Sequence, residues 1–315
     1  MGAVLEIDGL TRRFGPVVAN DAIDLRVRAG EVVGLLGHNG AGKTTLVSQI
    51  VGLLAPHAGT IRVAGVDAVA EPATARRCVA LQAQAQAPMD GLTPRTAIEI
   101  AARLRGMSRA NARAAALALV DELDVHEWLD RRATPDGGGL SGGVRRLTAF
   151  AMAAVAPVPL VVLDEPTNDV DAARRRRMWE SVRRLADGGA GVLLVTHNVV
   201  EAERVVDELV VLDRGRVAAA GSPSRLRGPG DHDLRLELSL HPDGADPSAD
   251  PPIPIVRRVR AGRRVLLTLG TSDAAAAVAW ATALRADARI EGYALAPATL
   301  EDAYLAATAE EPADV

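Results

Sequence analysis

The only lysine of this chain, Lys43, stands in the segment GHNGAGKTT at residues 37–45. The other members of its 36 Lys and Arg residues are all Arg, so the chain uses Arg wherever any cation suffices. A guanidinium is broad and planar, whereas an ammonium is a compact point charge that fits inside a tight loop against two phosphates. Glycines let such a loop turn and bring backbone N–H groups close to phosphate oxygens. The spacing G-x-x-x-x-G-K-[ST] therefore predicts a binding site for a nucleotide triphosphate.

The residues of this loop have separate expected roles. We expect Lys43 to reach the β- and γ-phosphates and Thr44 to bind Mg²⁺. The other loop residues expected to surround the phosphates are Gly37, His38, Asn39, Gly40, Ala41, Gly42 and Thr45. An apolar strand at residues 31–36 and a helix at residues 44–52 supply the flanking elements that the motif requires. The N-terminus of that helix adds its dipole to the anion site.

Two acids end a second apolar strand. Residues 160–163 are apolar and are followed by Asp164 and Glu165. We expect Asp164 to lie beside the phosphate loop and hold Mg²⁺ through water, and Glu165 to polarise an attacking water. Without Lys43, two solvated acids at the start of a loop would explain this pair equally well.

The segment LSGG at residues 140–143 is a second candidate anion site. It follows the glycines at 137–139 and precedes a predicted helix, and a serine at a glycine-rich helix N-terminus favours anions. It stands about 100 residues after the phosphate loop, so one chain need not bring both features to one nucleotide.

Composition limits the class of protein. A length of 315 residues predicts one large domain and a smaller one, or two domains. A net charge of −4 and 2% aromatic residues do not favour a nucleic-acid partner, and the Arg run at 174–177 predicts a solvated helix face more than a nucleic-acid patch. The single cysteine, Cys78, predicts a reducing compartment and a small buried side chain. The first ten residues show no signal-peptide pattern.

One apolar stretch, residues 147–163, approaches the length of a membrane span. Pro157 and Pro159 interrupt it, so a buried helix followed by a buried strand is the better interpretation. The chain is then expected to reach a membrane only through a partner.

The order of elements predicts an α/β protein. Strands at 160–163 and 191–196 enclose a helix at 172–186, and this order implies a mostly parallel sheet with a right-handed crossover. Composition changes near residues 227–230. A small α+β domain at 231–310 is predicted beyond it, followed by a disordered tail at 310–315. Other expected strands are 4–7, 23–27, 59–65, 234–240, 255–260, 263–269 and 290–295, and other expected helices are 95–105, 108–123, 273–286 and 299–308.

Four motifs in order, GHNGAGKTT, LSGG, LVVLDEPTND and VTHN, resemble the nucleotide-binding subunit of ABC transporters over residues 3–222. The resemblance implies a P-loop NTPase core at 1–228, with a helical signature subdomain at about 88–158, that hydrolyses ATP with Mg²⁺. It also implies a head-to-tail homodimer in which Ser141, Gly142 and Gly143 of one subunit meet the γ-phosphate of the ATP held by the other.

Further roles follow from the same resemblance. Phe14 matches the aromatic that stacks on adenine, usually Tyr in the family, with an ordinary core residue as the alternative. Gln84 is the best match to the Q-loop glutamine that contacts Mg²⁺ and water, although Gln82 and Gln86 stand nearby. His197 matches the histidine that bonds the γ-phosphate.

One further residue matches the family pattern, and two positions, in the signature and in the D-loop, differ from it. Asp171 keeps its D-loop place, but Asn168-Asp-Val-Asp171 replaces the commoner Gly-Leu-Asp ending. Val144 follows LSGG where the family usually has a polar residue.

The segment at residues 295–305 is similar to the ending of ATP-binding subunits from ABC-2-type exporters, which include daunorubicin-resistance systems. This similarity implies an integral membrane permease as partner, at the cytoplasmic face of the membrane, and no nucleic acid. The alternatives are a soluble ABC ATPase that acts on ribosomes or DNA, or an importer subunit. One cassette, no sustained heptads and no Cys pairs argue against the first, and the C-terminal segment argues against the second.

Overall fold

The computed structural model describes residues 2–85, 87, 89–134, 139–227, 234–242 and 246–299. The chain divides into two compact units, Met1–Ala220 and Gly221–Val315. The predicted boundary at residues 228–231 lies outside the described residues.

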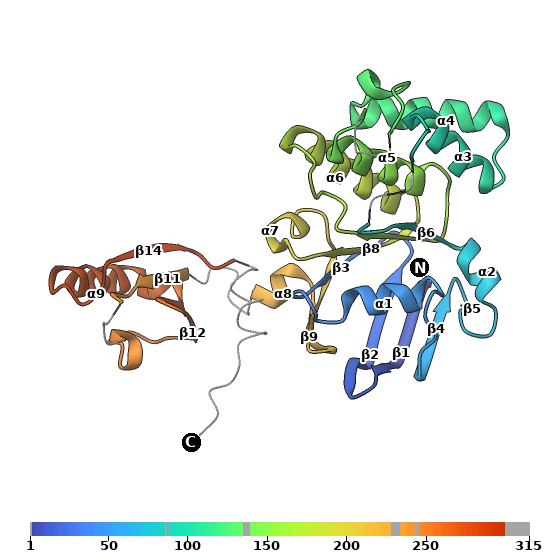
Figure 1. The fold of residues 1–315 in the computed structure, drawn as a ribbon. Helices are drawn as coiled ribbons and strands as arrows, with labels where there is room; N and C mark the ends of the chain where they lie inside the picture. The colour runs from blue at the N-terminus through green and yellow to red at the C-terminus, as the bar shows by residue number, and fades with distance from the viewer. Residues whose placement is uncertain are drawn as a thin grey trace. The chain divides into compact units, whose positions relative to one another are not determined.

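A six-stranded sheet with the order β10-β9-β3-β8-β7-β6 forms the centre of the first unit (Figure 1). β3 is parallel to β8 and β9, and β7 is parallel to β6 and β8. Every residue of β3, β7 and β8 is buried, as expected for strands covered on both faces. The predicted α/β class with a mostly parallel sheet is therefore confirmed. The strands are β3 (Val32–Leu36), β6 (Val79–Gln82), β7 (Leu160–Asp164), β8 (Gly191–Thr196), β9 (Glu208–Asp213) and β10 (Arg216–Gly221).

An antiparallel sheet with the order β2-β1-β4-β5 packs over helix α1 (Lys43–Ile50). Its strands are β1 (Ala3–Phe14), β2 (Val17–Arg28), β4 (Ala58–Val63) and β5 (Val66–Asp67). The prediction of short strands at 4–7 and 23–27 was wrong in extent, because β1 and β2 have 12 residues each. Register shifts, for example between Ile7 and Leu10, break the strict alternation that would have shown these lengths. Figure 1 shows α1 between the two sheets, and its Leu46 and Ile50 belong to one apolar core with residues of both.

Helices cover the opposite side of the parallel sheet (Figure 1). They include α3 (Pro94–Leu104), α4 (Arg109–Leu123), α5 (Gly142–Ala154) and α6 (Ala172–Asp187), and the first unit also has the shorter helices α2 (Pro72–Arg77) and α7 (Val199–Ala202). Ser108 caps α4 by accepting a hydrogen bond from Asn111 N. The apolar stretch at 147–163 is α5 followed by β7, as predicted. Within the described ranges, none of the helices is long and apolar enough to cross a membrane.

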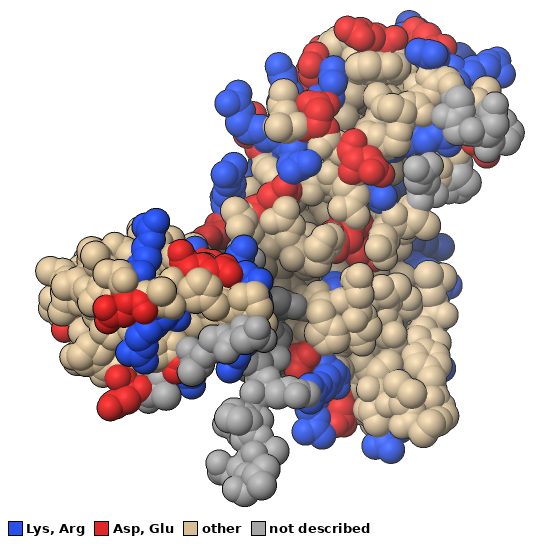
Figure 2. Space-filling view, turned by 60° about the vertical axis from the view of Figure 1, so that its left-hand side comes forward, with Lys and Arg blue, Asp and Glu red and all other residues tan. Residues whose placement is uncertain are grey.

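Charged side chains of both signs alternate over the helical part of the face shown in Figure 2. Three members of the Arg run at 174–177 form ion pairs, Arg174 with Asp171, Arg175 with Glu201 and Arg176 with Glu180. Cys78, expected to be buried, is half-buried, and it lies just after α2, where it packs against the core.

The second unit has an antiparallel sheet with the order β12-β13-β11-β14. Its elements are α8 (Pro223–Arg227), β11 (Leu234–Ser239), β12 (Arg257–Ala261), β13 (Arg264–Leu269), α9 (Ala274–Ala286) and β14 (Gly292–Pro297). Leu236, Leu267 and Ala281 belong to a core between this sheet and α9. Between β11 and β12 the chain forms a short 3₁₀ turn at Pro247–Ala249. The predicted helix at 299–308, apart from Thr299, and the tail at 310–315 lie outside the described residues.

Candidate functional site

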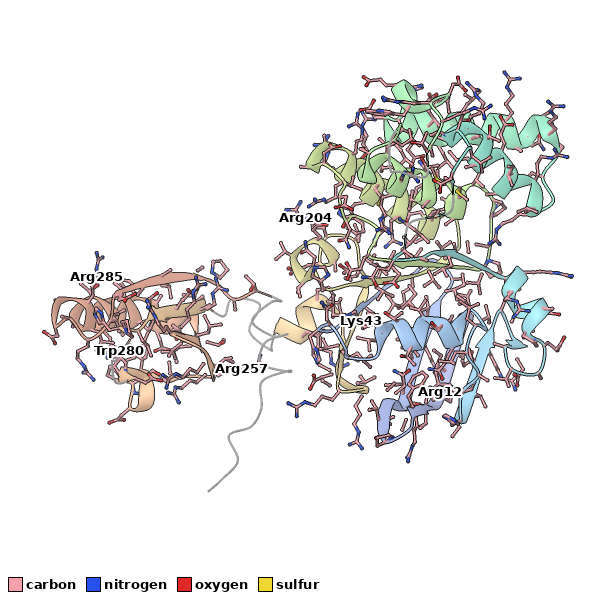
Figure 3. The ribbon with its side chains drawn as sticks, in the orientation of Figure 1. Arg12, Lys43, Arg204, Arg257, Trp280 and Arg285 are labelled. Atoms are coloured by element: carbon pink, nitrogen blue, oxygen red, sulfur yellow. The ribbon has the colours of Figure 1, made fainter. Side chains whose placement is uncertain are left out.

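The phosphate loop connects β3 to α1, and Lys43 begins the helix (Figure 3). The Lys43 ammonium donates to the carbonyl oxygens of Gly37 at 2.5 Å and His38 at 3.0 Å, and the residue is only 9% exposed. Burial lowers the pKa of Lys43, and the charges of Glu165 and Asp164 act in the opposite direction. The ammonium therefore lies folded inside the loop, with its charge poorly solvated. An anion at the loop would relieve that cost.

Gly42 cannot be another residue without moving the loop. Its φ is +105°, and a Cβ there would stand 2.2 Å from the carbonyl oxygen of Ala19. The Asn20 side chain donates from Nδ2 to the Gly42 carbonyl at 3.2 Å, and Gln49 Nε2 donates to Asn20 Oδ1 at 2.8 Å. Asn20 and Gln49 are 0% and 1% exposed. This buried amide pair, which was not predicted from the sequence, contacts the loop at the Gly42 carbonyl.

A cavity of about 580 Å³ opens beside the loop. Its lining brings together nine residues predicted for the site: Asn39, Gly40, Gly42, Lys43, Thr44, Thr45, Gln84, Asp164 and Glu165. The lining also includes Arg214 and residues 17–19, which the sequence analysis did not propose. Loop residues Gly37, His38 and Ala41 flank the cavity without lining it, and His38 is held by Asp213, 2.9 Å from its Nε2.

Asp164, the last residue of β7, has an altered acidity. Burial raises its pKa to about 6, and the neighbouring charge of Glu165 adds to this rise. Lys43 and Arg146 oppose it. The residue is 5% exposed. Asp164 is therefore a buried acid whose burial outweighs the charges of the two nearby cations.

The donor set fits Mg²⁺, which prefers a few protein oxygens and completes its shell with water and phosphate. Asp164, Thr44 and Gln84, whose side chains all carry oxygen, line the cavity together. Among the described residues, no group of three or more His, Cys, Asp or Glu could hold a metal ion. Bound there, the ion would neutralise phosphate charge.

Glu165 begins a sharp turn after β7, with a φ of +49°. Such backbone costs about 1–3 kcal/mol and is common at active sites. The Glu165 carboxylate accepts hydrogen bonds from the Thr196 hydroxyl at 3.1 Å and from the His197 backbone N–H at 3.0 Å. The His197 ring joins it through Nδ1 at 2.7 Å. His197 itself is outside the cavity lining, and its side chain is 60% exposed.

Of the neighbouring glutamines, Gln84 lines the cavity, whereas Gln82 is buried and donates to the carbonyl of Arg146 at 3.3 Å. This placement favours Gln84 as the residue that faces the nucleotide. Gln86 lies outside the described residues.

The signature residues lie apart from the cavity. Ser141 is the N-cap of α5 and accepts a hydrogen bond from Val144 N at 3.3 Å, with Gly142 and Gly143 in the first turn. A Cβ on Gly143 would stand 2.5 Å from the carbonyl oxygen of Asp169, so this glycine lets the D-loop pack against the helix. Val144 is buried in a small apolar cluster with Met89 and Leu140, which explains an apolar side chain there. Asp171 caps α6 through the N–H groups of residues 173 and 174.

Phe14 is the last residue of β1 and pairs across the turn with Val17, which lines the cavity. Its side chain is not in the core, because the residue is 47% exposed. The Arg12 guanidinium lies over its ring at 5.0 Å.

Comparisons with known proteins show the family to which this chain belongs. The family described as ABC transporter matches residues 20–168. The chain is 39% identical over 235 residues to the daunorubicin/doxorubicin resistance ATP-binding protein of Streptomyces peucetius, covering 74% of this chain and 70% of the relative. It is 34% identical over 317 residues to a Nod factor export ATP-binding protein of Paraburkholderia xenovorans, covering 99% of each.

A solved structure of an ATP-binding subunit of an ABC transporter matches with a TM-score of 0.66 and 29% identity, over 71% of this chain and 92% of that one. A dimeric ATP-binding cassette bound to ADP and Pi matches in fold, with a TM-score of 0.61, 22% identity, and coverage of 69% of this chain and 98% of that one.

The fold and the site are those of an ATP-hydrolysing cassette. The chain belongs to the ABC transporter family, as an ATP-binding protein of the drug-resistance-like exporter subfamily.

Proposed function

We propose that this chain is the ATPase subunit of an ABC-2-type exporter, and that two copies close around two ATP·Mg²⁺ to drive a separate integral membrane permease. In this proposal Lys43 and Thr44 hold phosphates and metal, Asp164 and Gln84 complete the metal site, and Glu165 activates water. The exported compound belongs to the drug, antibiotic, polysaccharide or lipid class and is selected by the permease. The subunit is held by the permease at the cytoplasmic face of the membrane.

One observation supports the proposed dimer. The cavity that contains Lys43 has no lining residue from the described signature residues, Ser141 to Gly143. Two phosphate-binding features in one chain therefore do not meet over one nucleotide. A head-to-tail dimer resolves this separation, because the signature of each subunit closes the cavity of the other.

Subunit mixing tests this arrangement directly. Lys43→Met and Ser141→Arg subunits should each be inactive alone. Mixed dimers contain one site built from the intact Lys43 of one subunit and the intact Ser141 of the other, so ATPase activity should return on mixing. Equal inactivity before and after mixing, with both variants folded and dimeric in cross-linking, would refute the shared site.

Glu165→Gln tests the assignment of the base. The amide keeps the shape of the side chain but cannot accept a proton, so ATP binding and dimer formation should persist. Turnover should fall about 10²- to 10³-fold, the usual cost of removing one preorganised group. A turnover close to wild type would exclude Glu165 as the group that activates water.

A groove of about 820 Å³ supports the permease as partner. Its apolar lining includes Leu81, Leu104 and Met152, and Leu104 is 84% exposed. Arg76, Arg77 and Arg105 also line it, and the described residues contribute no acidic side chain. An amphipathic permease helix with an apolar face and acidic neighbours fits this chemistry.

The partner proposal has its own test. The chain should be recovered from detergent extracts of its host membranes together with a multi-span protein, and Leu104→Asp should abolish that recovery while ATP binding by the purified chain persists. Recovery with ribosomes or DNA instead would favour the soluble ATPase alternative.

A further inference from the structure

The side chain of Arg146 connects the signature helix α5 to the strand end that carries Gln84. Arg146 is 7% exposed, and its Nη1 donates to the carbonyls of Ala83 at 3.1 Å and Gln84 at 2.8 Å. In the other direction, Gln82 Nε2 donates to the Arg146 carbonyl at 3.3 Å. Residues 82–84 are therefore fastened to α5 by three hydrogen bonds.

These bonds hold the end of β6, at Gln82, and the two residues that follow it. A hydrogen bond from a charged donor in a buried setting is stronger than a neutral one, and a buried carbonyl left without a donor is costly. The Gln84 carbonyl is thus fixed by Arg146, and Gln84 is one of the residues that line the cavity with Lys43 and Asp164.

We propose that Arg146 is a positioning residue for ATP hydrolysis, which holds Gln84 at the nucleotide and makes Gln84 and the signature helix move as one body. The link rests on the proposed function, in which Ser141 meets the ATP of the partner subunit. Ser141 caps the same helix that carries Arg146. A shift of Ser141 on the ATP of the partner would then be passed to Gln84 at the subunit's own ATP.

Arg145 provides a matched control. It precedes Arg146 in α5 and is equally buried, at 6% exposed. Its guanidinium donates to the Thr134 carbonyl at 2.7 Å and pairs with Asp90 at 3.3 Å, so its hydrogen bonds go to other residues than those of Arg146. Loss of Arg145 removes a buried guanidinium of the same kind without releasing Gln84.

The experiment compares Arg146→Met, Arg146→Lys and Arg145→Met in the full-length chain. Hydrogen–deuterium exchange of the peptide covering residues 79–85 reports the release of the segment. Binding of a fluorescent ATP analogue, followed by kcat, KM and the cooperativity of ATP hydrolysis, reports its effect on function.

Arg146→Met should raise exchange in that peptide, lower kcat about 10- to 100-fold, and remove cooperativity, with the Kd for nucleotide changed less than about three-fold. Arg146→Lys keeps a cation that can reach one carbonyl and should recover part of kcat. Arg145→Met should leave exchange and cooperativity unchanged.

Equal losses of kcat in Arg146→Met and Arg145→Met would overturn the proposal. The loss would then come from lower stability of the fold and not from the release of Gln84. A parallel loss of nucleotide binding and kcat in Arg146→Lys would also overturn it, because the loop itself would have collapsed. Failure of the proposed dimer would show separately, as no recovery of activity on mixing Lys43→Met with Ser141→Arg subunits.

Discussion

The carboxylate of Glu165 and the ring of His197 are joined by a hydrogen bond of 2.7 Å between Oε1 and Nδ1. The bond spans two neighbouring strands, because Glu165 directly follows β7 and His197 directly follows β8. Nε2 of the exposed ring takes no part in this bond. One residue can therefore orient the base and also bond a phosphate, provided that both ring nitrogens carry a proton and donate.

This relationship predicts that His197→Ala lowers kcat about 10²-fold while KM for ATP changes little. The backbone N–H of residue 197 and the Thr196 hydroxyl still hold Glu165, so the variant should fold and bind nucleotide. Steady-state kinetics of the purified chain measure the effect. His126→Ala is the control, because that histidine pairs with Asp121 on the surface. A kcat of His197→Ala equal to that of the control would remove His197 from the mechanism.

The buried Asp164 carboxyl predicts a pH-dependent stability. Its pKa is 3.8 in an ordinary setting and about 6 in the fold, so folding favours the protonated form. Stability carried by the neutral carboxyl is present at low pH and is lost as the pH rises through about 6. Asp164→Asn is neutral at all pH values and should raise the free energy of unfolding at pH about 8 by at most about 3 kcal/mol.

Denaturant unfolding of the nucleotide-free chain at pH about 8 and about 4 checks this, and the gain should vanish at the lower pH. Asp130→Asn is the contrasting control, since a hydrogen bond from Arg95 lowers the pKa of that acid. Its replacement should give no gain at the higher pH. If Asp164→Asn destabilised the chain at pH about 8, the buried-charge interpretation would be wrong.

The residues of the phosphate loop could be predicted from sequence because their geometry is local: a buried strand, glycines at fixed spacing and a helix. The parallel sheet could be predicted for a similar reason, because β7, α6 and β8 follow one another directly in the sequence as strand, helix and strand. The Asn20–Gln49 pair could not be predicted, because its members are 29 residues apart and each resembles an ordinary surface amide. Arg146 and Gln84, 62 residues apart, meet only once α5 packs on β6.

The Asn20–Gln49 pair predicts strong coupling in a double-mutant cycle. Asn20→Leu leaves the Gln49 amide without its 2.8 Å partner, and Gln49→Leu leaves Asn20 Oδ1 unpaired. Each single change should cost about 1–3 kcal/mol of unfolding free energy, because a buried polar group loses its hydrogen bond. The double variant replaces both amides by apolar groups and should cost clearly less than the sum.

Denaturant unfolding of the four proteins measures this coupling. Additive losses would mean that the two amides do not act as a unit. Nucleotide affinity provides a second readout, since Asn20 also donates to the carbonyl of Gly42 at 3.2 Å. The two variants that carry Asn20→Leu should therefore bind ATP more weakly than Gln49→Leu alone.

Phe14 predicts a contribution to nucleotide affinity that is independent of turnover. Its ring is 47% exposed at the end of β1, next to Val17 at the cavity, where an adenine could stack on it. Phe14→Ala should raise the Kd for ATP about 10-fold, because stacking of a base on an aromatic ring is worth about 1–3 kcal/mol. Phe14→Tyr should bind like wild type.

Arg12→Ala removes only the guanidinium on the ring and should have a smaller effect on the Kd for ATP. Because stacking tolerates any base, Phe14→Ala should weaken GTP binding by a similar factor. Titration with fluorescent nucleotide analogues measures the Kd of all three variants. An unchanged Kd for Phe14→Ala would show that Phe14 does not stack on the adenine of bound ATP.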